Sequence, residues 1–375
     1  MLHRNRFASM LAAVLYTLLC AYSPASRSAE PVVRSGVDGI LSAFETHPLV
    51  GLGDNHMLAN ELNFYTLVVR DPRFAAKVGN VVVEFGGSQH QDILDRYLDG
   101  DSVSYAELSQ VWHNTVGWDP TVEGVGYQTF FAVVRAVNAS LAPDKRIRVL
   151  LGEPPIYWSQ IRTHDAWQKI ADQRAAHAAD LIGREILSRS KKALVIYGTG
   201  HFFSLPWPST WPKPSAGIES LGEILDRLHP NALYRVTPYS GYKVAGCSVA
   251  LETQMKWPKR VLIAPIRGTP LVDALMRPEC MPKMEQAKPA IPADELRSIG
   301  RRVYEIDSGV AGDALLYIAP AEDLKRTPSD PAIWMDPELD QELRRRSVIR
   351  NGEEKAPLID DLRFYAQPPQ PWTPR

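Results

Sequence analysis

The stretch ALVIYGTGH, residues 193–201, decides the fold class of this chain and introduces its candidate site. Its uninterrupted run of aliphatic and aromatic residues is typical of a strand buried in a sheet. The run ends at Gly198 and Gly200, which favour a turn, and the turn leads to His201. A histidine at the end of a buried strand can point into a crevice. Alone, such a histidine is more often structural, so its partners must decide its role.

Three similar apolar runs precede this stretch, with helix-like segments between them. The runs are PLVGLG (48–53), VVVEF (81–85) and RVLLG (148–152). Strands that alternate with helices predict an α/β fold with a largely parallel central sheet flanked by helices. Apolar residues at helical spacing in 164–190 predict one helix with a face toward the core. Two further strands are predicted at RVLIAPI (260–266) and DALLYIAP (313–320).

Composition divides the chain into four parts. Residues 1–29 are expected to be a signal peptide, and 30–236 the α/β core. Residues 237–365 are richer in proline and are expected to complete the same domain, while 366–375 form a proline-rich tail. With 42 basic and 43 acidic residues, the net charge of −1 gives no support to nucleic acid or an anionic membrane as a partner.

The first residues have the pattern of a secretory signal. The basic start MLHRNR precedes an apolar stretch over 7–22, and small residues follow. We therefore expect a secreted or periplasmic protein that begins near residue 26 or 30 and has no membrane span after signal removal. An uncleaved anchor is the alternative, because the apolar stretch is near the shortest length that crosses a bilayer. Beyond the signal, Cys247 and Cys280 either form one disulfide or remain two buried thiols.

Each of the four core strands delivers an ionisable group at its end. These groups are Asp54 and His56, Glu84, Glu153, and His201. Ligands of parallel α/β sheets bind outside the carboxyl ends of the strands, so the groups are expected to converge although they lie far apart in sequence. We predict that the side chains of His56, Glu84 and His201 point into one crevice.

Structural explanations compete with this prediction. Glu84 follows three valines and could form a buried ion pair. Asp54 could cap the helix predicted over 56–69, and Glu153 could cap a turn before two prolines. His56 is expected at or just before the N-terminus of that helix, where the dipole would keep the imidazole neutral. A neutral ring could accept a proton or bind a metal.

Three residues are candidates for substrate binding. Glu153 ends the third strand, and Glu61 lies in the helix after His56. Arg174 falls on the apolar face of the 164–190 helix and needs an anionic partner. A carboxylate of the cluster could be that partner, with a plain ion pair as the alternative.

Two Gly-x-x-His motifs, GDNH (53–56) and GTGH (198–201), occur with a strand-borne glutamate after the first. This order resembles the superfamily that contains Tiki and TraB proteins, erythromycin esterases and ChaN-like haem-binding proteins. The stretches VVVEFGGSQHQDILDRYLDG, RVLLGEPPIYW and DALLYIAP resemble uncharacterised exported bacterial proteins within it. The resemblance implies that His56, Glu84 and His201 are active-site groups. Asp54 stands where relatives usually have glutamate.

The resemblance leaves three kinds of chemistry open, namely metal-free hydrolysis, metal-dependent proteolysis, and haem or iron binding. We expect a hydrolase of an ester- or amide-type bond that acts on a small molecule or a peptide. In it His56 takes a proton from water, Glu84 orients the imidazole or that water, and His201 polarises the carbonyl or protonates the leaving group. The same three residues could instead hold a divalent metal, and haem uptake is the main alternative function. Nucleophile-elbow, HExxH, Walker and dinucleotide motifs do not occur in the sequence.

Overall fold

The computed structural model describes residues 30–117, 124–202, 217–239, 256–266, 312–320 and 323–352. The predicted signal peptide, both of Cys247 and Cys280, and the proline-rich tail lie outside these ranges. Contacts divide the chain into residues 1–30 and a compact unit over 31–375. The described sheet, helices and candidate site belong to the second unit.

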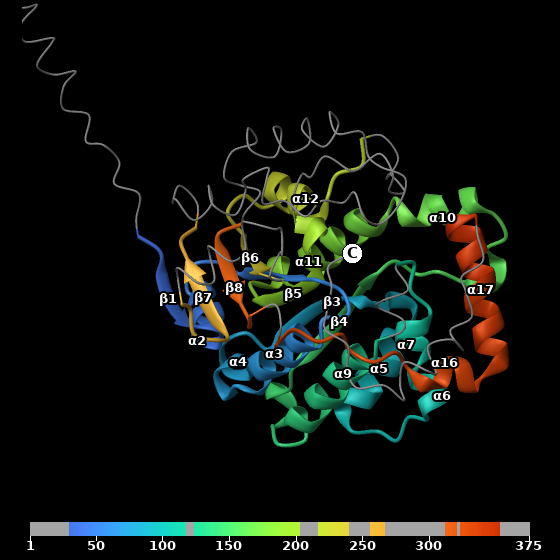
Figure 1. The fold of residues 1–375 in the computed structure, drawn as a ribbon, viewed down its shortest axis with the longest axis horizontal. Coiled ribbons are helices and arrows are strands. Elements are labelled where there is room, and N and C mark those ends of the chain that lie inside the picture. The colour runs from blue at the N-terminus through green and yellow to red at the C-terminus, as the bar shows by residue number, and fades with distance from the viewer. Residues whose placement is uncertain are drawn as a thin grey trace, which may run out of the picture. The chain divides into compact units, whose positions relative to one another are not determined.

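A mixed sheet of eight strands runs through this unit, with helices on both of its faces (Figure 1). The strand order is β1-β7-β8-β6-β2-β5-β3-β4, in which β8, β6, β2, β5, β3 and β4 run parallel. Among the described strands, the antiparallel pairs are β1 with β7 and β7 with β8. The expected α/β class with a largely parallel sheet is thereby confirmed. The strands are β1 (Val32–Ser35), β2 (Leu49–Asp54), β3 (Asn80–Gly87), β4 (Arg148–Glu153), β5 (Ala193–Gly198), β6 (Leu233–Tyr239), β7 (Val261–Ala264) and β8 (Ala314–Tyr317).

Each predicted strand overlaps one of these eight, and β1 and β6 are additional. Every residue of β2, β3 and β5 is buried, as expected for central strands covered on two faces. The strands β7 and β8, from the C-terminal part of the chain, extend the same sheet as the N-terminal core.

Two apolar layers pack against the sheet. One layer contains the apolar faces of α3 (Ala59–Arg70), α5 (Gln91–Asp99) and α9 (Val125–Asn138). The opposite layer contains those of α11 (Arg174–Glu185) and α12 (Leu221–Leu228). The remaining described α-helices are α2 (Gly36–Ala43), α4 (Pro72–Lys77), α6 (Tyr105–Leu108), α7 (Gln110–His113), α10 (His164–Ala171), α16 (Pro331–Met335) and α17 (Pro337–Asn351). Within the described ranges, no helix has both the length and the apolar character needed to cross a bilayer.

The single helix expected over 164–190 is two helices. α10 ends at Ala171, and α11 begins at Arg174. The two helices pack differently. α11 buries Ala178 and Ile182 against the sheet, whereas Trp167 of α10 packs against a small apolar cluster that includes Ile349 of α17. The break places Arg174 in the first turn of α11 instead of mid-helix.

Candidate functional site

The two Gly-x-x-His motifs follow neighbouring parallel strands. β2 ends at Asp54 and β5 at Gly198, and the two residues are paired in register. The next strand, β3, pairs with β5 only as far as Val83 and Ile196. Glu84 therefore lies where the ladder stops, and its Oε2 accepts a hydrogen bond from the backbone N–H of Gly198 at 2.5 Å. The carboxylate bridges two strands in place of the missing backbone pairing.

The other oxygen of Glu84 contacts Arg174 and His201. Oε1 accepts a hydrogen bond from Nη2 of Arg174 at 2.7 Å and lies 3.2 Å from Nε2 of His201. Burial by itself would raise the pKa of Glu84, but the charges of His201, His56 and Arg174 hold it well below its usual range. Glu84 is therefore a buried carboxylate that stays charged.

Arg174 joins Glu84 to Glu153. Its Nε donates to Oε1 and Oε2 of Glu153 at 2.9 and 2.8 Å. Burial raises the pKa of Glu153, and the charge of Arg174 opposes that rise. Since Glu153 is fully buried and held by Arg174, it supports the cluster and does not reach outward as a substrate contact, contrary to expectation.

His56 is held by Asp54, two residues before it. Nδ1 of His56 lies 2.8 Å from Oδ2 of Asp54. The same oxygen accepts a hydrogen bond from the hydroxyl of Tyr127 at 2.7 Å, and the hydroxyl of Tyr65 lies 3.1 Å from Oδ1. Asp54 therefore orients the imidazole and is itself oriented by two buried phenols, so it does not act as a helix cap.

The charge of His56 differs from the prediction. α3 begins only at Ala59, after a turn in which Met57 has a left-handed φ of 70°, so the ring is not at the helix N-terminus. Burial lowers the pKa of His56, but the hydrogen bond with Asp54 and the charges of Glu84 and Asp54 raise it to about 9. The expectation of a neutral ring was wrong, because the ring does not lie at a helix N-terminus and two nearby carboxylates raise its pKa.

Glu61 faces the protein interior. Its Oε2 and Oε1 accept hydrogen bonds from the backbone and side-chain nitrogens of Asn55 at 2.9 and 2.8 Å. Burial and the charge of Asp54 raise its pKa to about 8. At 0% exposure, Glu61 braces the turn that carries His56 and does not contact a substrate.

The three groups predicted to converge lie together at the carboxyl edge of the sheet. A Cβ placed on Gly198 would lie 2.9 Å from Nε2 of His56 and 3.2 Å from Oε2 of Glu84, so a glycine is required between them. The side chains of His56 and His201 are each 25% exposed, whereas those of Asp54 and Glu84 are 2% and 4% exposed. Two partly exposed imidazoles therefore contact two buried carboxylates.

These residues do not fit a metal ion. Both oxygens of Glu84 already accept N–H hydrogen bonds. Oδ2 of Asp54 accepts a hydrogen bond from the hydroxyl of Tyr127 and also contacts Nδ1 of His56. In the part of the chain that the structure describes, no group of three or more His, Cys, Asp or Glu side chains is arranged to hold a metal.

Three tyrosines of the site were not predicted. Tyr65 and Tyr127 bind Asp54, but in the sequence they look like ordinary members of apolar helix faces. The hydroxyl of Tyr197 is buried without a hydrogen-bond partner among the described residues. It packs on Gly152, where a Cβ would lie 1.8 Å from the oxygen. Tertiary packing alone brings these residues to the cluster.

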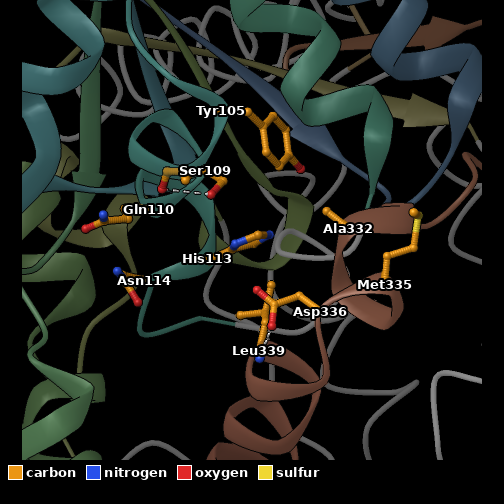
Figure 2. A pocket seen from close by; sticks show the side chains of 10 residues that line it. Tyr105, Ser109, Gln110, His113, Asn114, Ala332, Met335, Asp336 and Leu339 are labelled. Carbon is orange, nitrogen blue, oxygen red and sulfur yellow. Dashed lines mark hydrogen bonds between the residues drawn. The ribbon is translucent and has the colours of Figure 1, made fainter.

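A separate pocket of about 520 Å³ lies between α6, α7, α16 and the start of α17 (Figure 2). His113, Asn114 and Asp336 are among its polar side chains. None of His56, Glu84 or His201 lines it. Nε2 of His113 lies 3.7 Å from Oδ2 of Asp330, so this buried histidine faces a carboxylate of its own.

Comparisons with known proteins give two weak structural likenesses. No family model and no curated protein matches it. Among solved structures, the type III effector HopBA1 is 16% identical over 59% of this chain and 90% of the effector, with a TM-score of 0.35. A Bacillus cereus protein is 12% identical over 77% of this chain and 91% of its own, with a TM-score of 0.45. Likenesses of this size say nothing about activity.

Proposed function

We propose that the protein is a hydrolase of an ester- or amide-type bond that uses two histidines and no metal. One observation carries the proposal: two partly exposed imidazoles lie at the same edge of the sheet, and each contacts a buried carboxylate, His56 that of Asp54 and His201 that of Glu84. Such pairs of groups supply general acid and general base catalysis.

The electrostatics favour roles opposite to those expected from the sequence. With its pKa raised to about 9, His56 is protonated at neutral pH and carries its free proton on Nε2, because Nδ1 is bound to Asp54. We therefore assign His56 as the electrophile and general acid. The Nε2 atom of His201 faces Glu84, which leaves Nδ1 to accept a proton from water.

The reaction then needs only water and the two rings. Nδ1 of His201 takes a proton as the water oxygen attacks the carbonyl carbon, while Nε2–H of His56 stabilises the oxygen that becomes negative. The carbon–oxygen or carbon–nitrogen bond breaks as His56 gives its proton to the leaving group. The products are a carboxylic acid and an alcohol or amine. Exchange with solvent moves the proton from His201 back to His56.

Water as the nucleophile is supported by the surroundings of the rings. In the described ranges, no Ser, Thr or Cys side chain is hydrogen-bonded to His56 or His201. N–H and O–H donors already engage both oxygens of Glu84 and Oδ2 of Asp54, and no step of the proposed reaction needs a metal. No specific contact favours the alternative of haem binding.

The test is a screen of ester and peptide substrates with the purified protein, followed by comparison with His56→Ala and His201→Ala. General acid and base catalysis each contribute about a hundred- to ten-thousand-fold, so each variant should lose turnover by about that factor. His47→Ala is the matched control, because that histidine lies outside the cluster and hydrogen-bonds Thr46.

Two outcomes would contradict the proposal. Folded His56→Ala and His201→Ala proteins with full activity would show that the cluster is structural. A strong Soret band in the purified protein that disappears in either variant would replace hydrolysis with haem binding.

We further propose membership in the Tiki, erythromycin esterase and ChaN-like superfamily, and export to the periplasm or the medium. The first is supported by the two motif histidines after adjacent strands, with Glu84 beside both. The second rests on the sequence of residues 1–29 alone. N-terminal sequencing of protein from its native host tests export, and a soluble cytoplasmic protein that retains Met1 would refute it.

A further inference from the structure

The segment 113–117 has an unusual set of backbone hydrogen bonds. It begins at the last residue of α7 and belongs to no strand, and every one of its five carbonyl oxygens accepts a hydrogen bond from a side chain. The donors, in order from residue 113 to residue 117, are Arg346, Gln89, Trp158, Trp167 and Arg350, at distances of 2.7, 2.8, 3.1, 3.2 and 2.9 Å. Irregular backbone fixed so completely is held in one conformation.

The two ends of this segment are held by α17, more than 200 residues further along the chain. Arg346 donates through Nη1 to the carbonyl of His113 and through Nη2 to Oδ1 of Asn114 at 3.1 Å. Arg350 donates to the carbonyl of Gly117. Both arginines are buried, at 7% and 8% exposure. Removing their hydrogen bonds would leave buried carbonyl groups without partners, which destabilises this conformation of the segment.

The last residue of the segment lies against the guanidinium of Arg174. A Cβ placed on Gly117 would lie 2.7 Å from Nη2 and 3.3 Å from Cζ of Arg174. That Nη2 is the atom that donates to Glu84. The same Cβ would lie 3.4 Å from Oε2 of Glu153, so the backbone of Gly117 lies directly against the Arg174–Glu153 ion pair.

A second loop is fixed from the same helix. Arg345 donates to the carbonyls of Ile161 and Trp158 at 2.9 and 2.8 Å, in the loop that follows Glu153. Ile349 packs with Val116 and Trp158 in one small apolar cluster. α17 therefore holds both chain segments that flank the ion pairs of Arg174, although it contributes no residue to the cluster itself.

We propose that Gly117, fixed by Arg346 and Arg350 of α17, is a positioning residue that keeps Arg174 on Glu84 and thereby sets the catalytic geometry. Its role in catalysis rests on the proposed hydrolytic function, but its action on Arg174 does not. The contact of Gly117 with Nη2 and Cζ, together with the hydrogen bonds from Nε to both oxygens of Glu153, opposes movement of Arg174 away from Glu84.

The sharpest test is a double-mutant cycle of Gly117→Ala and Arg174→Lys. The added methyl group should push Nη2 off Glu84 and lower kcat about ten- to a hundredfold with little change in KM, since small misplacements of catalytic groups cost that much. Lysine has no Nη2 atom, so Gly117→Ala should have no further effect in the Arg174→Lys background. Effects that multiply in the double variant would overturn the proposal. Gly183→Ala is the control, because its methyl group meets only a 3.7 Å contact.

The same cycle can be followed without any substrate. The charge of Arg174 lowers the pKa of His56, so displacing the guanidinium should raise the ring's pKa, which NMR titration measures. Gly117→Ala should raise it in the wild-type background and leave it unchanged in Arg174→Lys. If this coupling is seen but no substrate is found, the positioning role stands and the proposed hydrolysis fails. If the shift is the same in both backgrounds, the positioning role fails whatever the activity.

The contribution of α17 is tested by Arg350→Leu, which keeps the aliphatic bulk and removes the hydrogen bond to Gly117. We expect kcat to fall by about tenfold and the His56 titration to shift in the same direction as in Gly117→Ala. If Arg350→Leu does not fold, the double-mutant cycle decides alone. A folded Arg350→Leu protein with wild-type kcat and His56 titration would exclude α17 from the role.

Discussion

The backbone nitrogen of Gly198 lies 2.5 Å from Oε2 of Glu84, across two neighbouring strands whose ladder has ended two residues earlier. Through this bond one side chain fixes the end of β5, from which the second motif departs. Oε1 of the same residue contacts Arg174 and His201. The structural and the proposed catalytic role of Glu84 therefore cannot be separated.

Glu84→Gln should lose stability as well as activity. The amide presents one acceptor and one donor where three N–H groups now converge, so a buried donor is left unpaired. We expect the free energy of unfolding to fall by about 1–3 kcal/mol, measured by chemical denaturation. Glu45→Gln, at an exposed position, is the control. Equal stability of Glu84→Gln and wild type would show that Glu84 does not hold the two strands.

Gly198→Ala should disturb the cluster, whereas Gly200→Ala in the same motif should not. A Cβ at Gly198 meets His56 and Glu84, but at Gly200 it meets no atom within 4 Å. We expect Gly198→Ala to lower turnover up to about a hundredfold and to change the titration of His56, and Gly200→Ala to leave both as in wild type. Equal effects of the two substitutions would contradict this account of the site.

Asp54→Asn should lower the pKa of His56. The wild-type ring, with a pKa raised to about 9, stays protonated until the pH approaches that value. Because its folded pKa lies above the ordinary 6.5, its contribution to stability is fully present below pH 6.5 and is lost as the pH rises through about 9. If His56 acts as the acid, kcat should fall above about pH 9 in wild type and at a lower pH in Asp54→Asn. NMR titration and kcat against pH measure both effects, and an unchanged His56 titration would rule out Asp54 as their cause.

Glu61 predicts a different dependence of stability on pH. Burial raises its pKa from 4.5 to about 8, so between these values the folded protein binds a proton that the unfolded chain has released. Stability should therefore decrease with rising pH across this window, by at most about 1.4 kcal/mol per pH unit, and level off above about pH 8. Glu61→Gln should remove this decrease. Chemical denaturation of wild type and Glu61→Gln at pH 5 and pH 8 measures this decrease in each protein. The control Glu45→Gln should show the same decrease as wild type.

Continuous apolar runs determined the strands that matter most. β2, β3 and β5 were predictable because strands buried on both faces need apolar residues at nearly every position. β6 was missed since its run is interrupted by Arg235 and Pro238. Arg235 is tolerated there because its guanidinium donates to the carbonyl of Phe202 and to Asp226. β1 is a short exposed edge strand and carries no pattern at all.

The placement of His56, Glu84 and His201 at one sheet edge also followed from the sequence, since the carboxyl ends of parallel strands share an edge. The charge of His56 and the contacts of Asp54, Glu61 and Glu153 did not follow from the sequence. Those depend on hydrogen bonds and ion pairs between elements far apart in the chain, such as Tyr127 with Asp54 and Arg174 with Glu153. Local sequence fixes which groups reach the edge of the sheet. Only the tertiary structure decides their protonation and partners, because burial and neighbouring charges set a pKa and neither is a property of the local sequence.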